Sequence, residues 1–95
     1  MSVVRINEFQ ATESRRDELR AVLQSILSTV RAADGCLSCQ LLESESDPQK
    51  FVVIESWCSR DAHQAAASRL SGDELRRAMT LVADLPRAGY YVEIP

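Results

Sequence analysis

The sequence contains no apolar segment that approaches the roughly 20 residues needed to cross a membrane. No basic segment followed by an apolar one is visible, so we expect no secretory signal and a cytoplasmic protein. Positive charge is not in excess, because 11 Lys and Arg against 14 Asp and Glu give a net charge of −3. The arginines alternate with acids along helical patterns and form no basic stripe, which disfavours nucleic acid as a partner.

Cysteine is present in an odd number, three, so the sequence predicts no disulfide framework. Cys36 and Cys39 form a C-x-x-C motif, but a strand is predicted here and would place residues three apart on opposite faces. A redox pair needs a helix N-terminus, and a zinc site needs four ligands, whereas the chain has one histidine and one further cysteine. We therefore expect no metal site, and we expect all three cysteines, Cys58 included, to be small packing residues.

What the chain does contain is typical of one small globular domain. Of its 95 residues, 45% are hydrophobic and 26% are charged, a balance that excludes a disordered chain. No internal repeat, low-complexity tract or linker interrupts the pattern. We therefore expect a single domain over residues 1–95.

Two strands joined by a turn organise the rest of the chain. Residues 36–43 and 51–57 are rich in apolar, β-branched and aromatic side chains, and the polar segment between them contains Asp47-Pro48. Both faces of the second strand are largely apolar, so we expect it to be central in a sheet and covered on both sides. One helix layer covers one face only. A second copy of the chain would cover the other, which predicts a homodimer with its sheets face to face.

A long amphipathic helix is predicted before this hairpin. Six apolar residues recur with the helical period and form one stripe: Leu19, Val22, Leu23, Ile26, Leu27 and Val30. Ser14 is the expected N-cap, with Asp17 and Glu18 near the positive end of the helix dipole. Asp34-Gly35 is the expected stop, because glycine adopts the left-handed cap conformation without penalty.

Residues 2–10 alternate as a strand. Ile6 lies on its apolar side, and Arg5, Asn7 and Phe9 lie on a mixed side. Asn7 is thus a polar side chain in the middle of a predicted sheet. It either hydrogen-bonds a neighbouring strand or helix end, or orients a ligand in a pocket, because a buried amide needs partners.

Two short helices and a last strand over residues 89–94 follow the hairpin. Ser59 caps the first helix, whose alanine-rich face indicates an adjacent cavity, and His63 lies at the edge of this face. A capping box at residues 71–74 opens the second, whose apolar stripe includes Met79. The whole order predicts an α+β, ferredoxin-like βαββαβ fold with an antiparallel sheet and its helices on one face. The hairpin excludes a Rossmann-type parallel sheet.

Three stretches resemble the antibiotic biosynthesis monooxygenase superfamily of dimeric α+β barrels. They are G-C-L-x-C-x-L at residues 35–41, D-P-x-x-F-V-V-I-E-x-W at 47–57, and S-R-D-A at 59–62. The resemblance extends over almost the whole chain, and the E-x-W formed by Glu55 and Trp57 is its most recognisable part. It implies a homodimer whose sheets face one another, with a pocket in each subunit between the sheet and the helices.

The superfamily includes cofactor-independent quinol and anthrone oxygenases, haem-degrading enzymes and an isomerase of a signalling molecule, so the fold does not fix the chemistry. Haem-degrading members have an asparagine on the first strand, and Asn7 resembles it. The places of their tryptophan and axial histidine hold Ala66 and Arg76 or Arg77, so we expect no iron ligation. Many quinol oxygenases carry a histidine at the place of Ala66. Here the only histidine, His63, lies one helical turn earlier, and it is either a pocket residue or a surface or capping histidine.

The resemblance therefore implies a homodimeric monooxygenase, without metal or flavin, that oxidises an electron-rich aromatic such as a quinol or anthrone. The predicted catalytic residues are Asn7, which would hydrogen-bond a substrate oxygen, and His63, the candidate base. Trp57 is either a core aromatic or the residue that packs on the substrate ring. The other predicted substrate-binding residues are Phe9, Ala66, Met79 and Arg69, the last as an oxyanion partner. The main alternative is a non-catalytic small-molecule-binding domain on the same dimeric scaffold. Haem degradation, which the residues at 66, 76 and 77 disfavour, and an isomerase-like activity rank below it.

Overall fold

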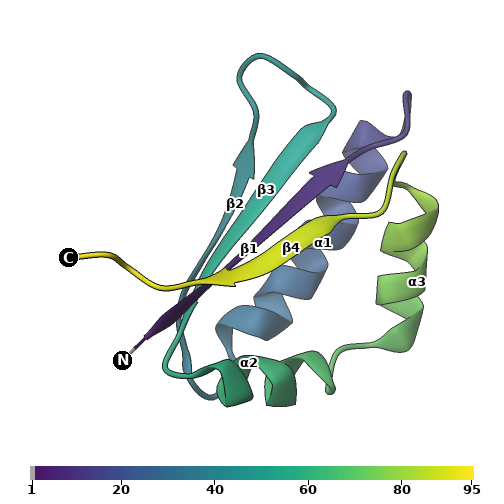
Figure 1. Cartoon of the computed structure of the whole chain (residues 1–95). Coiled ribbons are helices and arrows are strands. Elements are labelled where there is room, and N and C mark those ends of the chain that lie inside the picture. Colours follow the sequence, from purple (N-terminus) through teal and green to yellow (C-terminus); the bar gives the residue numbers. More distant parts are fainter. Residues whose placement is uncertain (1) are drawn as a thin grey trace.

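A four-stranded antiparallel sheet carries three helices on one side, in a computed structural model that describes residues 2–95 (Figure 1). In chain order the elements are β1 (Val3–Gln10), α1 (Arg16–Arg31), β2 (Cys36–Glu43), β3 (Lys50–Trp57), α2 (Arg60–Ala67), α3 (Gly72–Thr80) and β4 (Arg87–Tyr91). The strand order is β2-β3-β1-β4. The α+β, ferredoxin-like prediction is confirmed, and β3 is central as expected. None of these three helices is long and apolar enough to span a membrane.

The core lies between α1 and the helix-facing side of the sheet. Along β3 the buried residues alternate, and Phe51, Val53 and Trp57 are each at most 2% exposed. The six apolar residues predicted for the stripe of α1 are all buried against them. The apolar stripe of α1, which follows the helical period of 3.6 residues, therefore packs on the alternate side chains of β3 that face the helices, as the sequence predicts.

The start of α1 differs from the prediction. Ser14 is not the N-cap, because its φ of 70° places it in a left-handed turn, and the helix begins at Arg16. Arg15 occupies the cap position and no side chain caps the helix there. Asp17 and Glu18 do lie in the first turn, where the helix dipole favours acidic groups.

Gly35 adopts the predicted left-handed conformation, but beyond the helix rather than at its cap. α1 ends at Arg31, and Gly35, with φ of 86°, forms the turn into β2. A Cβ atom at this position would lie 2.7 Å from Cβ of Ala62 and 2.9 Å from Sγ of Cys58. Glycine is therefore required both by the backbone angle and by the close approach of α2.

A β-bulge in β2 corrects the prediction that Cys36 and Cys39 face opposite ways. The register shifts between Cys36 and Ser38, so that Cys36 pairs with Trp57 and Cys39 pairs with Glu55. Both cysteines thus lie on the helix-facing side and pack, half-buried, against the core. Burial raises the pKa of the Cys39 thiol to about 11, which keeps it protonated and unreactive. Cys58 is exposed, so the packing prediction is wrong for this third cysteine.

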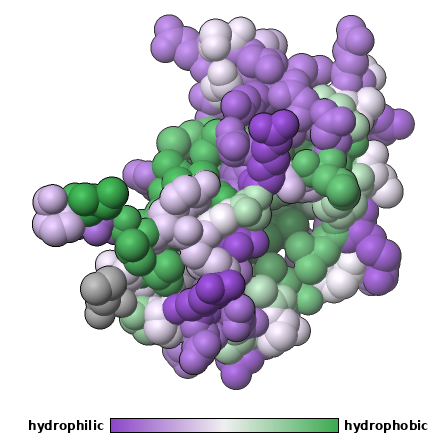
Figure 2. Space-filling view, in the orientation of Figure 1, coloured by the Kyte–Doolittle hydropathy of each residue, from purple (hydrophilic) through white to green (hydrophobic). Residues whose placement is uncertain are grey.

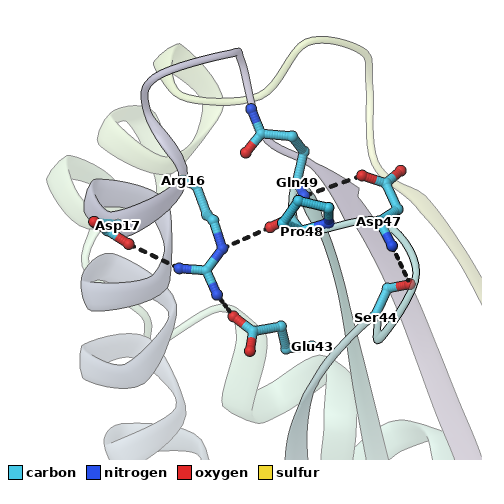
Figure 3. Close-up of polar contacts among 7 residues, drawn as sticks. All are labelled: Arg16, Asp17, Glu43, Ser44, Asp47, Pro48 and Gln49. Atoms are coloured by element: carbon cyan, nitrogen blue, oxygen red, sulfur yellow. Dashed lines mark hydrogen bonds and ion pairs between the residues drawn. The ribbon is translucent and has the colours of Figure 1, made fainter.

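The turn between β2 and β3 is fastened to the first residue of α1 (Figure 3). Nε of Arg16 donates to the carbonyl oxygen of Pro48 at 2.7 Å, and its guanidinium also pairs with Asp17 and with Glu43. Within the turn, the carboxylate of Asp47 accepts a hydrogen bond from the Gln49 amide at 3.0 Å. The Asp47-Pro48 turn is confirmed, and it fixes the position of α1 over the hairpin.

The last strand begins two residues earlier and ends three residues earlier than predicted. β4 runs from Arg87 to Tyr91, and Val92 and Ile94 lie beyond it, 58% and 89% exposed. The side of the sheet opposite the helices carries Ile6 and an apolar row around it, which no element of residues 2–95 covers. This row comprises Val4, Ile6, Leu42, Val52, Ile54 and Tyr91.

Candidate active site

A cavity of about 340 Å³ lies between the helix-facing side of the sheet and the helices. In the view of Figure 2, which has the orientation of Figure 1, apolar side chains gather around a hollow in the surface. Most of the wall is apolar, with Leu23, Ile26, Leu27 and Val30 from α1 and Leu75, Ala78 and Met79 from α3. Four polar side chains interrupt it: Arg5, Asn7, Glu55 and His63. A mostly apolar pocket with a few convergent polar groups is the usual form of a small-molecule site.

The strands bring these polar groups together through their alternation and register. Arg5 and Asn7 are two residues apart on β1, so both face the helices. In the register of β1 and β3, Arg5 lies opposite Glu55, and Asn7 lies opposite Val53. None of the side-chain hydrogen bonds among residues 2–95 involves Arg5 or Asn7. The structure thus does not supply the intramolecular partner that one interpretation of Asn7 requires.

Glu55 and Trp57, the two defined residues of the E-x-W motif, are joined by a buried hydrogen bond. Nε1 of Trp57 donates to Oε1 of Glu55 at 2.8 Å, and the two residues are 1% and 5% exposed, respectively. Burial raises the pKa of the Glu55 carboxyl above its usual value, while the Trp57 hydrogen bond and the charge of Arg5 act in the opposite direction. Trp57 is thus a core residue and also part of the cavity wall.

His63 reaches the cavity from α2, with its side chain only 14% exposed. Its Nδ1 shares a hydrogen bond of 2.5 Å with the Tyr90 hydroxyl, and its Nε2 lies 4.0 Å from Oε1 of Glu55. The imidazole also meets the rings of Trp57 and Tyr90 edge-on, at centroid distances of 5.4 and 5.3 Å. Burial, and then the charge of Arg5, lower the pKa of His63, which favours the neutral imidazole that a general base requires.

Tyr90 orients His63, and its ring is itself contacted by two guanidinium groups. The carbon at the centre of the Arg5 guanidinium lies 4.7 Å from the Tyr90 ring centroid, and that of Arg60 lies 4.4 Å from it. Cation–π contacts of this kind fix the plane of the ring. If Nδ1 of His63 carries the proton, it donates to Tyr90 and leaves Nε2 free to accept a proton from a ligand.

Six of the seven site residues predicted from the sequence lie in the wall of this cavity: Asn7, Phe9, Trp57, His63, Ala66 and Met79. Arg69 does not join them. It lines a second cavity of about 480 Å³, between the end of α1, the turn after it and α2. Ala66 lines both cavities. The two positions compared with a haem ligand, Arg76 and Arg77, are exposed on α3.

Three residues of the site were not predicted to belong to it: Arg5, Glu55 and Tyr90. Arg5 could have been found, because it alternates with Asn7 and Phe9 on one side of β1. Glu55 is the charged residue on an otherwise apolar face of β3. Nothing in the sequence indicates that Tyr90 meets His63, since the two are far apart along the chain. Within the described part of the chain, no group of three or more His, Cys, Asp or Glu residues could hold a metal ion.

The fold is that of an α+β, ferredoxin-like protein with a mostly apolar cavity between its sheet and helices. Comparison with known sequences gives its family. The sequence model of the antibiotic biosynthesis monooxygenase family matches residues 2–79, so this chain belongs to that family. The matched span includes every predicted site residue but ends before Tyr90.

Named relatives agree with this assignment. "Putative monooxygenase Rv0793" of Mycobacterium tuberculosis is 34% identical over 93 residues, covering 87% of this chain and 91% of the relative. Its solved structure superposes with a TM-score of 0.86 and 26% identity, over 100% of this chain and 97% of that one. A conserved protein from Methanosarcina mazei has a TM-score of 0.87 at 11% identity, over 96% of this chain and 91% of that one. This last likeness concerns the fold alone.

Proposed function

We propose that this protein is a monooxygenase that uses molecular oxygen to oxidise an electron-rich hydroxyaromatic, such as a quinol or anthrone, without a metal or flavin. The observation that carries the proposal is the state of His63. This histidine lies in the wall of an apolar cavity, its neutral form is favoured by burial, and one of its ring nitrogens is held by Tyr90. A base so placed suits removal of a phenolic or enolic proton from a bound ring.

The reaction balances without a further reductant. Nε2 of His63 takes the hydroxyl proton, and Glu55 stabilises the resulting imidazolium from 4.0 Å away. The substrate anion transfers one electron to oxygen, and the radical pair recombines to a carbon–oxygen bond. Protonated His63 returns its proton to the peroxide, which then loses water. Overall, a CH₂ group, or a ring CH together with the hydroxyl hydrogen, reacts with O₂ to give a carbonyl and H₂O. Asn7 would hydrogen-bond the substrate oxygen, while Trp57, with Phe9 and Met79, would pack on the ring and exclude water.

Oxygen uptake tests this proposal. Purified protein, supplied with a panel of hydroquinones and anthrones, is expected to consume oxygen faster than autoxidation. Asn7→Ala should reduce that rate about 10²-fold, as loss of one oriented donor to a developing oxyanion does. The matched control is Gln24→Ala, which removes an exposed amide side chain on α1 that does not line the cavity. Tight binding of the panel without oxygen uptake would reject the enzyme and favour the alternative, a binding domain.

We infer, in addition, that two copies of the chain associate through the uncovered side of the sheet. The support is the apolar row on that side, in which Leu42 is 44% and Tyr91 54% exposed in a single chain. Sedimentation equilibrium is expected to give twice the 10.6 kDa of one chain. Ile54→Arg, in the middle of the row, should yield monomers, whereas Gln64→Arg on α2 should not. A monomeric parent protein would contradict this association. A cytoplasmic location stays a prediction.

A further inference from the structure

Arg5 is the charged side chain for which neither the fold nor the proposed function accounts. It lies in the cavity wall, and its Nε is buried with no hydrogen-bond acceptor among residues 2–95. The ion pairs of the described chain do not include it, although Glu55 is its partner in the strand register. A buried donor without an acceptor costs free energy, so it calls for a functional explanation.

The surroundings of Arg5 hold the guanidinium without using its donors. The group stacks on the Tyr90 ring at 4.7 Å, a contact with the ring face that leaves the N–H edge available. Oε1 of Glu55 is already taken by the Trp57 indole, so Glu55 balances the charge of Arg5 through space. The cavity therefore contains a fixed cation with free donors beside an apolar wall.

We propose that Arg5 holds an oxyanion of the ligand, so that the cavity selects aromatic molecules with an ionisable hydroxyl group and binds them best as phenolates. The inference rests on the proposed function only in taking this cavity as the substrate site. A planar guanidinium matches an oxyanion in geometry and charge, and the apolar wall matches the ring. Arg69, for which the sequence suggested an oxyanion role, lies in the other cavity.

The test compares three ligands of similar size that do not need oxygen. 4-Nitrophenol ionises near neutral pH, its methyl ether 4-nitroanisole does not ionise, and 4-nitrobenzoate is a carboxylate. Calorimetry at a pH where free 4-nitrophenol is ionised is expected to show that the phenolate binds at least about tenfold more tightly than the ether. The same ratio should appear as a fall of about one in the pKa of 4-nitrophenol on binding, measured by absorbance.

Variants then assign the preference to Arg5. Arg5→Met should remove it, and Arg5→Lys, which keeps a charge but loses Nε, should keep only part of it. The matched control is Arg60→Met, because Arg60 stacks on the same Tyr90 ring but does not line the cavity. Circular dichroism checks that each variant folds. If Arg5→Met does not fold, the preference for phenolate over ether is compared between the parent protein and Arg5→Lys. This comparison still tests whether the preference depends on Arg5.

Three results would overturn the assignment. They are equal binding of phenolate and ether by the parent protein, a preference that survives Arg5→Met, and tighter binding of 4-nitrobenzoate than of the phenolate. None of these measurements depends on turnover. Absence of oxygen uptake would therefore reject the proposed function alone, and absence of the phenolate preference in the parent protein, or its survival in Arg5→Met, would reject the role of Arg5 alone.

Discussion

Replacing His63 with alanine is expected to lower kcat/KM for oxygen uptake by about 10²–10⁴-fold, the usual contribution of a positioned general base. The variant loses the imidazole that lies between Tyr90 and Glu55 in the cavity, while the ring of Trp57 remains. The measurement is oxygen consumption with whichever hydroquinone or anthrone the parent protein oxidises fastest. His63 is only partly buried and belongs to a helix without buried residues, so we expect the variant to fold.

The neighbouring residue provides the control for this substitution. Gln64→Ala changes an exposed side chain on the same helix and should leave the rate unchanged. The pH profile gives a second readout. Because the pKa of His63 is lowered, the base stays neutral further into acid, and the acidic fall in kcat/KM should lie below the usual histidine value of about 6.5. A His63→Ala enzyme as fast as the parent would show that another group removes the proton.

Phe51→Ala is expected to lower the free energy of unfolding by about 3–5 kcal/mol, the range for truncating a buried phenylalanine. Phe51 is 1% exposed and is the partner of Phe9 in the strand register. The Arg16 guanidinium lies 5.7 Å from its ring centroid, so the side chain also supports the start of α1. Since small domains have only about 5–15 kcal/mol of stability, this loss is a large part of the total. Urea denaturation at one fixed protein concentration measures it.

Leu85→Ala is the comparison for Phe51→Ala, because Leu85 is 81% exposed and should change stability by no more than about 0.5 kcal/mol. Holding the protein concentration constant matters, since association of two copies would add to the stability of both variants. A Phe51→Ala protein as stable as the parent would mean that the core around α1 closes over the space left by the ring.

Sequence patterns predicted the helices and strands of this fold well. They failed where a turn or a bulge changes the course of the backbone. The stripe of α1, the hairpin and the central position of β3 follow from periodicity, which depends only on which side chains are apolar. The left-handed turn at Ser14 and the bulge after Cys36 each shift the chain by about one residue. Such shifts depend on how the neighbouring elements meet, as in the pairing of Cys36 with Trp57. Alternation alone therefore assigned Cys39 to the wrong face.

Site residues could be predicted where the pattern within one strand or helix identifies them. Contacts between elements far apart in the sequence could not be predicted. Asn7 and Trp57 stand out on their own strands, and the structure places both at the cavity. The hydrogen bond between His63 and Tyr90 joins α2 to β4, and neither segment indicates the other. Arg69 was predicted to belong to this site, but it lines the other cavity. It follows α2 closely, and the direction of its side chain, into the second cavity, is set by how the chain leaves that helix.

The central position of β1 has a consequence for the kinetics of folding. This strand pairs with β3 from the middle of the sequence and with β4 from its last part, so closing the sheet requires contacts between residues far apart along the chain. Such contacts slow folding relative to a helical bundle of the same size. Asn7 and Tyr90 come from the first and last strands, so no autonomous fragment of the chain can hold both. Recovery of ligand binding after dilution from denaturant should therefore follow the same time course as recovery of the sheet.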